Sequence, residues 1–215
     1  YVAWCLKNKL GMNPLGVFCE PPLMTSLGKK NLSNFENSGF SVLRIAASSS
    51  DRKLNKFMFK KFGFAQYSWL AAIKIAPIKI ASLMNIRLIM WGEEGESMYG
   101  GYNKDRNKLK FNTKLINKVY LENIPTKNFS NKDDLYWQSL TKKEIKSVEK
   151  IYTCFWSYFE KWDEFMHLRV AKKYCGLEEA KHKELNAINK HSHTDQKMFS
   201  LHMYLAYLKY GFSRA

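Results

Sequence analysis

Three carboxylates and several glycines gather in one short part of the chain. Residues 91–96 read Trp-Gly-Glu-Glu-Gly-Glu, and residues 99–101 add Tyr-Gly-Gly. Glycine lets a backbone approach a ligand closely, while carboxylates can hold a metal–phosphate complex or orient an amine. In a strongly basic chain this acidic turn favours a binding or catalytic role. The alternative is an acidic turn that only stays solvated.

A second polar segment, residues 48–51 (Ser-Ser-Ser-Asp), could start a helix directly after a strand. Backbone N–H groups and hydroxyls at such a place can meet a phosphate or a ribose, but an ordinary helix N-cap explains the same residues equally well. The sequence contains neither G-x-x-x-x-G-K-[ST] nor G-x-G-x-x-G, and it lacks the G-x-S-x-G motif of serine hydrolases. If the chain handles a nucleotide, its main phosphate-binding loop is therefore not among these residues.

The elements that must position these segments alternate between helix and strand. Hydrophobic periodicity predicts helices over residues 1–11, 25–38, 48–62 and 67–85 and short, buried strands over residues 15–19, 40–45 and 87–91. This order predicts an α/β fold, a parallel sheet with helices on both faces and the strand 87–91 at its centre. Ligands bind such sheets at the carboxyl ends of the strands, so residues 19–20, 46–50 and 92–96 are the candidate segments.

The apolar region 69–91 is long enough to suggest a membrane span, but Lys74, Lys79 and Arg87 interrupt it. A buried helix followed by a strand explains it better. Pro77 would start or kink this helix, and one face would bury the side chains of Ile80, Leu83 and Met84.

The pattern changes after residue 102. Residues 103–134 are polar and rich in Lys and Asn, which is typical of an insertion or lid. We therefore divide the chain into an α/β domain (1–102), this insertion (103–134) and a mostly helical C-terminal region (135–215). The last region includes a capping box at 141–144, a strand at 151–156, a helix over 163–173 and a final helix. That final helix has an apolar stripe of Met198, Leu201, Leu205 and Leu208, whose helical spacing favours packing against the rest of the chain.

The charge balance suits an anionic partner. Lys and Arg total 35 against 19 Asp and Glu, a net charge of +16. The cations are mostly Lys and are spread along the chain, which disfavours nucleic acid as the partner. The four cysteines are isolated, so we expect a reduced, cytoplasmic protein. The histidine pair His191 and His193 predicts a solvated loop, and we expect no metal site and no membrane partner.

Residues 6–17, 89–93, 99–101 and 201–215 resemble the N-acetyl sugar amidotransferases of the PP-loop ATP pyrophosphatase superfamily. The resemblance extends over nearly the whole chain. It implies an adenine nucleotide alpha hydrolase-like fold, ATP and Mg²⁺ as cofactors, and a cytoplasmic enzyme of pseudaminic or legionaminic acid or O-antigen pathways. Such enzymes convert the acetamido group of a nonulosonic acid or related sugar into an acetamidino group through an adenylated amide. Their ammonia comes from a glutaminase subunit with a cyclase-like partner, resembling those of histidine biosynthesis.

The resemblance also implies roles for individual residues. Glu93 and Arg214 would be catalytic. The substrate would meet Glu94, Glu96, Tyr99, Gly100 and Gly101. The nucleotide would meet Gly92. Cys19, Ser48 and Ser49 are further nucleotide candidates because of their place after predicted strands and not because of the resemblance.

Several features of the family bear on these roles. Its members begin with a strand and an S-G-G-x-D-S loop before the first helix and continue past the G-F-x-R-A element, so we expect an internal fragment that is inactive alone. Many relatives carry a C-x-x-C segment where this chain has residues 64–69 without cysteine, and Ser213 stands where glycine is expected.

Two other functions stay open. One is a PP-loop enzyme that adenylates a tRNA base for thiolation or lysine transfer. The other is a non-catalytic basic module in which residues 103–131 wrap an acidic partner.

Overall fold

The computed structural model describes residues 1–92, 132–182 and 189–211. The chain forms two compact units. The first unit comprises residues 1–3 and 70–165, and the second comprises residues 4–69 and 166–215. The predicted division at residues 102 and 134 stays a prediction, since the segment between these positions lies almost wholly outside the described residues.

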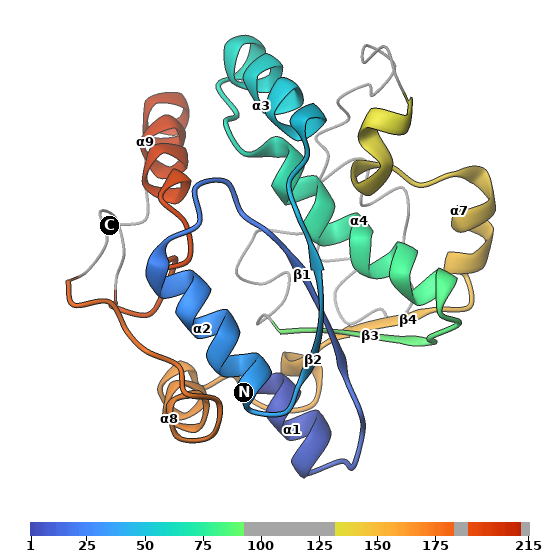
Figure 1. Ribbon diagram of the computed structural model, residues 1–215, viewed down its shortest axis with the longest axis vertical. Coiled ribbons are helices and arrows are strands. Elements are labelled where there is room, and N and C mark those ends of the chain that lie inside the picture. Colours follow the sequence, from blue (N-terminus) through green and yellow to red (C-terminus); the bar gives the residue numbers. More distant parts are fainter. Residues whose placement is uncertain (93–131, 183–188, 212–215) are drawn as a thin grey trace. The chain divides into compact units, whose positions relative to one another are not determined.

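The second unit contains a parallel pair of strands with helices around it (Figure 1). Its elements are α1 (Val2–Asn8), β1 (Leu15–Cys19), α2 (Ser26–Asn37), β2 (Ser41–Ile45), α3 (Ser49–Phe62), α8 (Glu164–Cys175) and α9 (Met198–Tyr210). The first two residues of α1 and of α8 belong to the first unit. Strands β1 and β2 are parallel and pair from Leu15 with Ser41 to Cys19 with Ile45. The predicted helices and strands of this part are confirmed, with ends within about three residues.

Local signals explain where these elements begin and end. Thr25 caps α2 by accepting a hydrogen bond from the Gly28 N–H at 2.9 Å. Ser48 and Asp51 form a reciprocal capping box at the start of α3. Gly63 ends that helix in the left-handed region at φ +63°, which glycine adopts without strain.

The first unit has a second parallel pair of strands. Its elements are α4 (Tyr67–Leu83), which begins in the second unit, β3 (Leu88–Trp91), the 3₁₀ helix η4 (Lys132–Gln138), α7 (Lys142–Val148), β4 (Tyr152–Phe155) and the 3₁₀ helix η5 (Trp156–Tyr158). Strands β3 and β4 pair from Leu88 with Tyr152 to Trp91 with Phe155. The predicted capping box of Thr141 and Glu144 is present at the start of α7.

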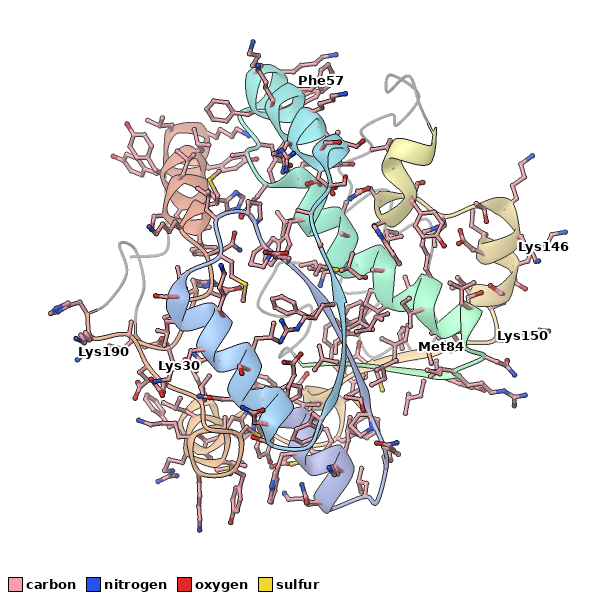
Figure 2. All side chains as sticks on the ribbon, in the orientation of Figure 1. Lys30, Phe57, Met84, Lys146, Lys150 and Lys190 are labelled. Atoms are coloured by element: carbon pink, nitrogen blue, oxygen red, sulfur yellow. The ribbon has the colours of Figure 1, made fainter. Side chains whose placement is uncertain are left out.

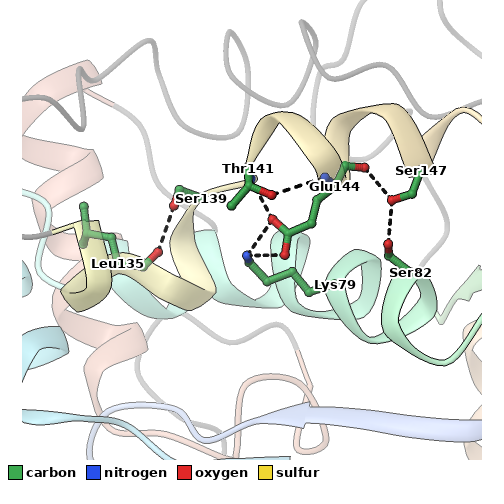
Figure 3. A network of polar contacts seen from close by, with 7 residues as sticks. All are labelled: Lys79, Ser82, Leu135, Ser139, Thr141, Glu144 and Ser147. Carbon is green, nitrogen blue, oxygen red and sulfur yellow. Dashed lines mark hydrogen bonds and ion pairs between the residues drawn. The ribbon is translucent and has the colours of Figure 1, made fainter.

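A buried lysine joins α4 to α7 in this unit (Figure 3). Lys79 is 1% exposed, and its ammonium donates to both carboxylate oxygens of Glu144, at 2.8 and 2.9 Å. The ammonium also lies 4.2 Å from the centre of the Tyr136 ring. One turn further along both helices, the hydroxyls of Ser82 and Ser147 share a hydrogen bond of 2.5 Å. A charged group buried in this way is tolerated because the ammonium is paired with a carboxylate and lies near an aromatic ring.

Several sequence predictions need correction. The described residues form two sheets of two strands instead of one larger sheet, so β3 is not a central strand there. Strand β2 is also not buried along its length, because only Ile45 is covered. The parallel α/β arrangement is correct, whereas the PP-loop fold stays a prediction.

The apolar faces of two helices also differ from the prediction. Ile80 is buried, but Leu83 and Met84 are exposed because α4 ends there and the chain turns at Asn85, whose φ is +54° (Figure 2). Pro77 lies inside α4, so the prediction that it could start this helix is wrong. In α9 no residue is buried, so its predicted stripe does not face a core.

No helix in the described part of the chain is long and apolar enough to cross a membrane. The apolar region that suggested one is α4 and β3, as predicted. Buried small and aliphatic side chains, Ala71, Ile75 and Ile78 among them, pack α4 into the first unit.

Candidate functional site

The carboxyl ends of β1 and β2 lie side by side in the second unit. Cys19 is paired with Ile45, and the N–H of Glu20 donates to the Ile45 carbonyl at 2.8 Å, which extends the ladder by one residue. Glu20 and Ala46 therefore leave the sheet at the same edge. In parallel sheets this edge is where ligands bind, so this is the place at which a site is expected.

A pocket of about 300 Å³ opens at this edge. It is lined by Phe18, Glu20, Met24, Lys29, Leu32, Arg44 and Ala46. Side chains two residues apart on a strand share a face, which explains why each strand contributes an alternate pair. Helix α2 closes the other side with Lys29 and Leu32, three residues apart on one helical face. The pocket thus lies between the sheet and α2.

The charges around the pocket are two cations and one carboxylate. Arg44 is held by Glu36 of α2 through two hydrogen bonds, one from Nε to Oε1 at 2.7 Å and one from the other arm of the guanidinium. These bonds lower the pKa of Glu36 and raise that of Arg44, to which the charge of Glu20 adds. Lys29 forms no ion pair among the described residues, so its ammonium is available to a ligand.

A distant segment holds the start of α2, which forms one wall of the pocket. Met24 forms an antiparallel bridge with Gln196, and Thr25 donates its hydroxyl to the Thr194 carbonyl at 2.6 Å. At Gly28 a Cβ would lie 2.8 Å from the backbone Cα and O of Asp195. Only glycine fits such a contact, so the pocket wall depends on this close approach.

On the other face of the same sheet, at the end of β1, lies the thiol of Cys19. The Cys19 thiol is buried, and this burial, with the nearby negative charge of Asp51, raises its pKa to about 12. Asp51 itself is used by the capping box, accepting from the Ser48 N–H at 2.6 Å. Cys19 is therefore a protonated core residue and not a nucleophile.

None of the predicted nucleotide residues of this unit lines the pocket, and the structure gives two of them other partners. The Ser48 hydroxyl caps α3, which is the alternative that the sequence left open, and the Cys19 carbonyl accepts a hydrogen bond from the Trp69 indole at 3.0 Å. Ser49 is the exposed first residue of α3. Of Cys19, Ser48 and Ser49, only Ser49 therefore has a polar group that is exposed and forms no hydrogen bond of this kind.

In the first unit, Gly92 follows β3 and is exposed. A Cβ built on it would meet no atom within 4 Å. The neighbouring Trp91 ring lies 4.9 Å from the Lys74 ammonium and 6.4 Å from the Phe155 ring. Two aromatic rings and an ammonium thus lie close together at the carboxyl end of β3. The remaining predicted site residues lie outside the described residues: Glu93, Glu94, Glu96, Tyr99, Gly100, Gly101 and Arg214.

Sequence reasoning missed Lys29 and Arg44, the two cations of the pocket. A signal for both existed. Arg44 stands two residues before Ala46, and Phe18 stands two before Glu20, so each pair shares a sheet face once the parallel register is known. Lys29, Leu32 and Glu36 follow the helical spacing of three and four residues. The missing information was which face of each strand α2 covers.

The histidine pair does not lie in a solvated loop, as the sequence predicted. The His193 ring stacks on Phe199 at 3.5 Å, and neighbouring Thr194 and Gln196 are buried against the start of α2. In the described ranges no three His, Cys, Asp or Glu side chains are close enough to share a metal ion.

The size and lining of the pocket can be compared with those of known ligand sites. Its volume is at the lower end of the range for ligand pockets, about 300–1,000 Å³, and its lining combines apolar side chains with cations. Phe18, Met24 and Leu32 would suit a planar base, and Lys29 would suit an anionic group. Glu20 is the one carboxylate of this lining, so Mg²⁺ stays a prediction.

Comparison with known proteins leaves these expectations untested, because no protein-family model matches the chain and no curated protein matches it.

Proposed function

We propose that this chain belongs to an ATP-dependent N-acetyl sugar amidotransferase and that the pocket at the carboxyl ends of β1 and β2 is part of its nucleotide site. The observation that carries the proposal is the pocket itself. It stands where parallel α/β sheets bind ligands, and it combines an apolar lining with the available ammonium of Lys29.

The residues of the pocket have distinct tasks in this proposal. Phe18, Met24 and Leu32 contact the base and exclude water from it. Lys29 meets a negative charge of the nucleotide as a mobile point charge. Arg44 is already engaged by Glu36, so its guanidinium is fixed in place before a ligand arrives.

When bound, ATP supplies the adenylyl group that turns the unreactive amide oxygen of the sugar into a leaving group, so that ammonia can replace it. The proposal assigns the ammonia to a glutaminase subunit and its cyclase-like partner. Glu93 and Arg214 remain the proposed catalytic residues, and Glu94, Glu96, Tyr99, Gly100 and Gly101 the proposed contacts of the sugar. Mg²⁺ would accompany the phosphates.

Nucleotide binding tests the pocket without requiring activity. Titration calorimetry with ATP and AMP would compare the chain with Lys29→Met and with Lys30→Met. Lys30 is the matched control, because it follows Lys29 on the same helix but forms an ion pair with Glu178 at 2.7 Å. We expect Lys29→Met to weaken ATP binding about tenfold, the usual effect of losing one charged contact, and Lys30→Met to leave it unchanged.

Equal losses in both variants, or no binding of either nucleotide at millimolar concentration, would remove the nucleotide assignment. The reaction is tested separately, with the complete gene product and its glutaminase partner, by incorporation of nitrogen-15-labelled ammonia into the acetamido group of a nonulosonic acid. Nucleotide binding without incorporation would leave a nucleotide-binding protein of another reaction class.

A further inference from the structure

Helix α9 exposes an apolar stripe. Leu201, Tyr204, Tyr207 and Leu208 are between 37% and 61% exposed. Their spacing of three and four residues places them on one face of the helix. The whole helix is apolar, and yet no residue of it is buried. Apolar helices are normally covered by another part of the protein or by a binding partner.

The opposite face of α9 is fixed to the second unit. The His202 ring lies 5.7 Å from the Phe64 ring and 6.1 Å from the Phe199 ring. Near the end of α9, the Lys209 side chain comes within 3.3 Å of the position that a Cβ on Gly63 would occupy. Gly63 directly follows α3, so the C-terminal ends of α3 and α9 are neighbours, and the stripe of α9 stays exposed beside them.

Helix α3 adds a cationic face. Leu54 and Met58 point into the core. The outward positions carry Arg52, Lys53, Lys56 and Lys60 around Phe59, which is 44% exposed. Among the described residues these four cations form no ion pair. The one acidic residue of α3, Asp51, is buried in the capping box. We call the exposed faces of these two helices the α3–α9 surface.

We propose that the α3–α9 surface binds an anionic lipid bilayer at its interface. Two properties of the surface support this occupant. Interfacial binding needs exposed apolar and aromatic side chains next to cations, which attract anionic headgroups. Leu201 and Leu208 supply aliphatic groups, and Lys53, Lys56 and Lys60 supply long side chains that can reach headgroups while their stems lie on apolar surface.

A nucleic acid fits the surface less well. Exposed leucines have no counterpart in a phosphate backbone. Four of the five cations of α3 are Lys and not Arg, which pairs with phosphate through two hydrogen bonds. The 13 residues of α9 are too few to cross a bilayer, so the helix would lie in the plane of the interface. This inference does not rest on the proposed nucleotide site.

Flotation with lipid vesicles tests it on the whole chain. We expect binding to vesicles of phosphatidylcholine and phosphatidylglycerol, and little binding to phosphatidylcholine alone. Replacing Lys53, Lys56 and Lys60 together by Gln should weaken binding roughly 100-fold, since each cation near an anionic membrane contributes about fivefold. The charge-matched control is the triple Gln variant of Lys142, Lys143 and Lys146, which are exposed on α7.

The apolar contribution has its own pair of variants. Leu208→Ser should lower binding about tenfold, because the interface rewards buried apolar area. Leu10→Ser is the control, since Leu10 is comparably exposed in the turn after α1. Circular dichroism and thermal melting identify any variant that fails to fold, and Tyr204→Ser then tests the same stripe.

Four results would overturn the proposal. They are equal binding to both kinds of vesicle, equal loss in test and control variants, preferential binding to single-stranded RNA over the anionic vesicles, and a dimer in solution that Leu208→Ser dissociates. The third result would favour a nucleic-acid surface, and the fourth would mean that a second copy covers α9.

Discussion

Breaking the buried ion pair of Lys79 and Glu144 should have a strongly asymmetric effect on stability. In Glu144→Gln the Lys79 ammonium, 1% exposed, would lose its counter-ion and keep only an amide oxygen and the ring of Tyr136. An uncompensated buried charge costs about 3–5 kcal/mol. The capping box should largely survive, because Gln at its third position can still accept from the Thr141 N–H.

Replacing the other partner, Lys79, should lower the free energy of unfolding by less. Lys79→Met removes the buried charge and fills the same space with a flexible apolar side chain. Glu144 is 15% exposed and would keep its cap hydrogen bond, so water and Thr141 could satisfy it. We expect a loss of about 1 kcal/mol, and a loss no larger than this in the double variant, because the double variant buries no unpaired charge.

Urea unfolding followed by tryptophan fluorescence measures these differences. With a slope of about 2 kcal/mol per molar urea, Glu144→Gln should lower the midpoint by about 1.5 M or more and Lys79→Met by about 0.5 M. Ser139→Ala serves as a mild reference in the same network, since it loses one hydrogen bond to the Leu135 carbonyl. The argument is refuted if Lys79→Met costs as much as Glu144→Gln, or if Glu144→Gln costs less than about 1 kcal/mol.

The same pair predicts an acid dependence. Burial acts to raise the pKa of Glu144, but hydrogen bonds from Lys79 and Thr141 outweigh it, and the pKa is lowered overall. A carboxyl with a lowered pKa contributes stability above its unfolded value, and this contribution is lost as the pH falls through the folded value. The free energy of unfolding should therefore decline as the pH falls below the ordinary pKa range of a glutamate. The decline should be smaller in Lys79→Met, which lacks the ion pair.

Three further predictions concern glycine, cysteine and serine residues of the chain. Gly28→Ala should destabilise the fold by about 1–3 kcal/mol, because its Cβ would overlap facing backbone, whereas Gly92→Ala should be neutral in the same melting experiment. The Cys19 thiol should resist alkylation near pH 8.5, about the pKa of a free thiol, and react once the protein is unfolded. Because the pKa of Cys19 is raised in the folded protein, its contribution to stability is complete below the pKa of the unfolded chain and is lost as the pH rises toward 12. Ser48→Ala should cost about 1 kcal/mol in urea unfolding through loss of the cap, and Ser49→Ala should cost much less.

The sequence predicts the local elements well, because their signals are contained in a few neighbouring residues. Thr25, Ser48 and Thr141 each accept the N–H that a helix start leaves unpaired, and the helix begins at the next residue. Gly39 and Gly63 adopt positive φ just where the predicted helices end. These interactions need no distant partner, so periodicity and turn chemistry suffice to place them.

Distant contacts are what the sequence could not predict. Lys79 reads as an interruption of an apolar run, and only its partner 65 residues away shows why it can be buried. Met24 and Gly28 depend on residues 194–196, which no local pattern connects to them. The predicted stripe of α9 failed for a related reason, because periodicity identifies an apolar face but not whether anything covers it.

In the candidate site, the sequence also could not predict which of two adjacent side chains faces the pocket. Position at the end of a strand points to residues 19 and 20 alike, but successive side chains of a strand point to opposite faces. Cys19 therefore turns toward Asp51 and α3, where burial keeps its thiol protonated, while Glu20 turns toward Arg44 and the pocket beneath α2. A ligand in this pocket would meet Glu20 and Lys29, whereas the Cys19 carbonyl already accepts a hydrogen bond from the Trp69 indole. The chemistry of the site is thus set by the face that α2 covers.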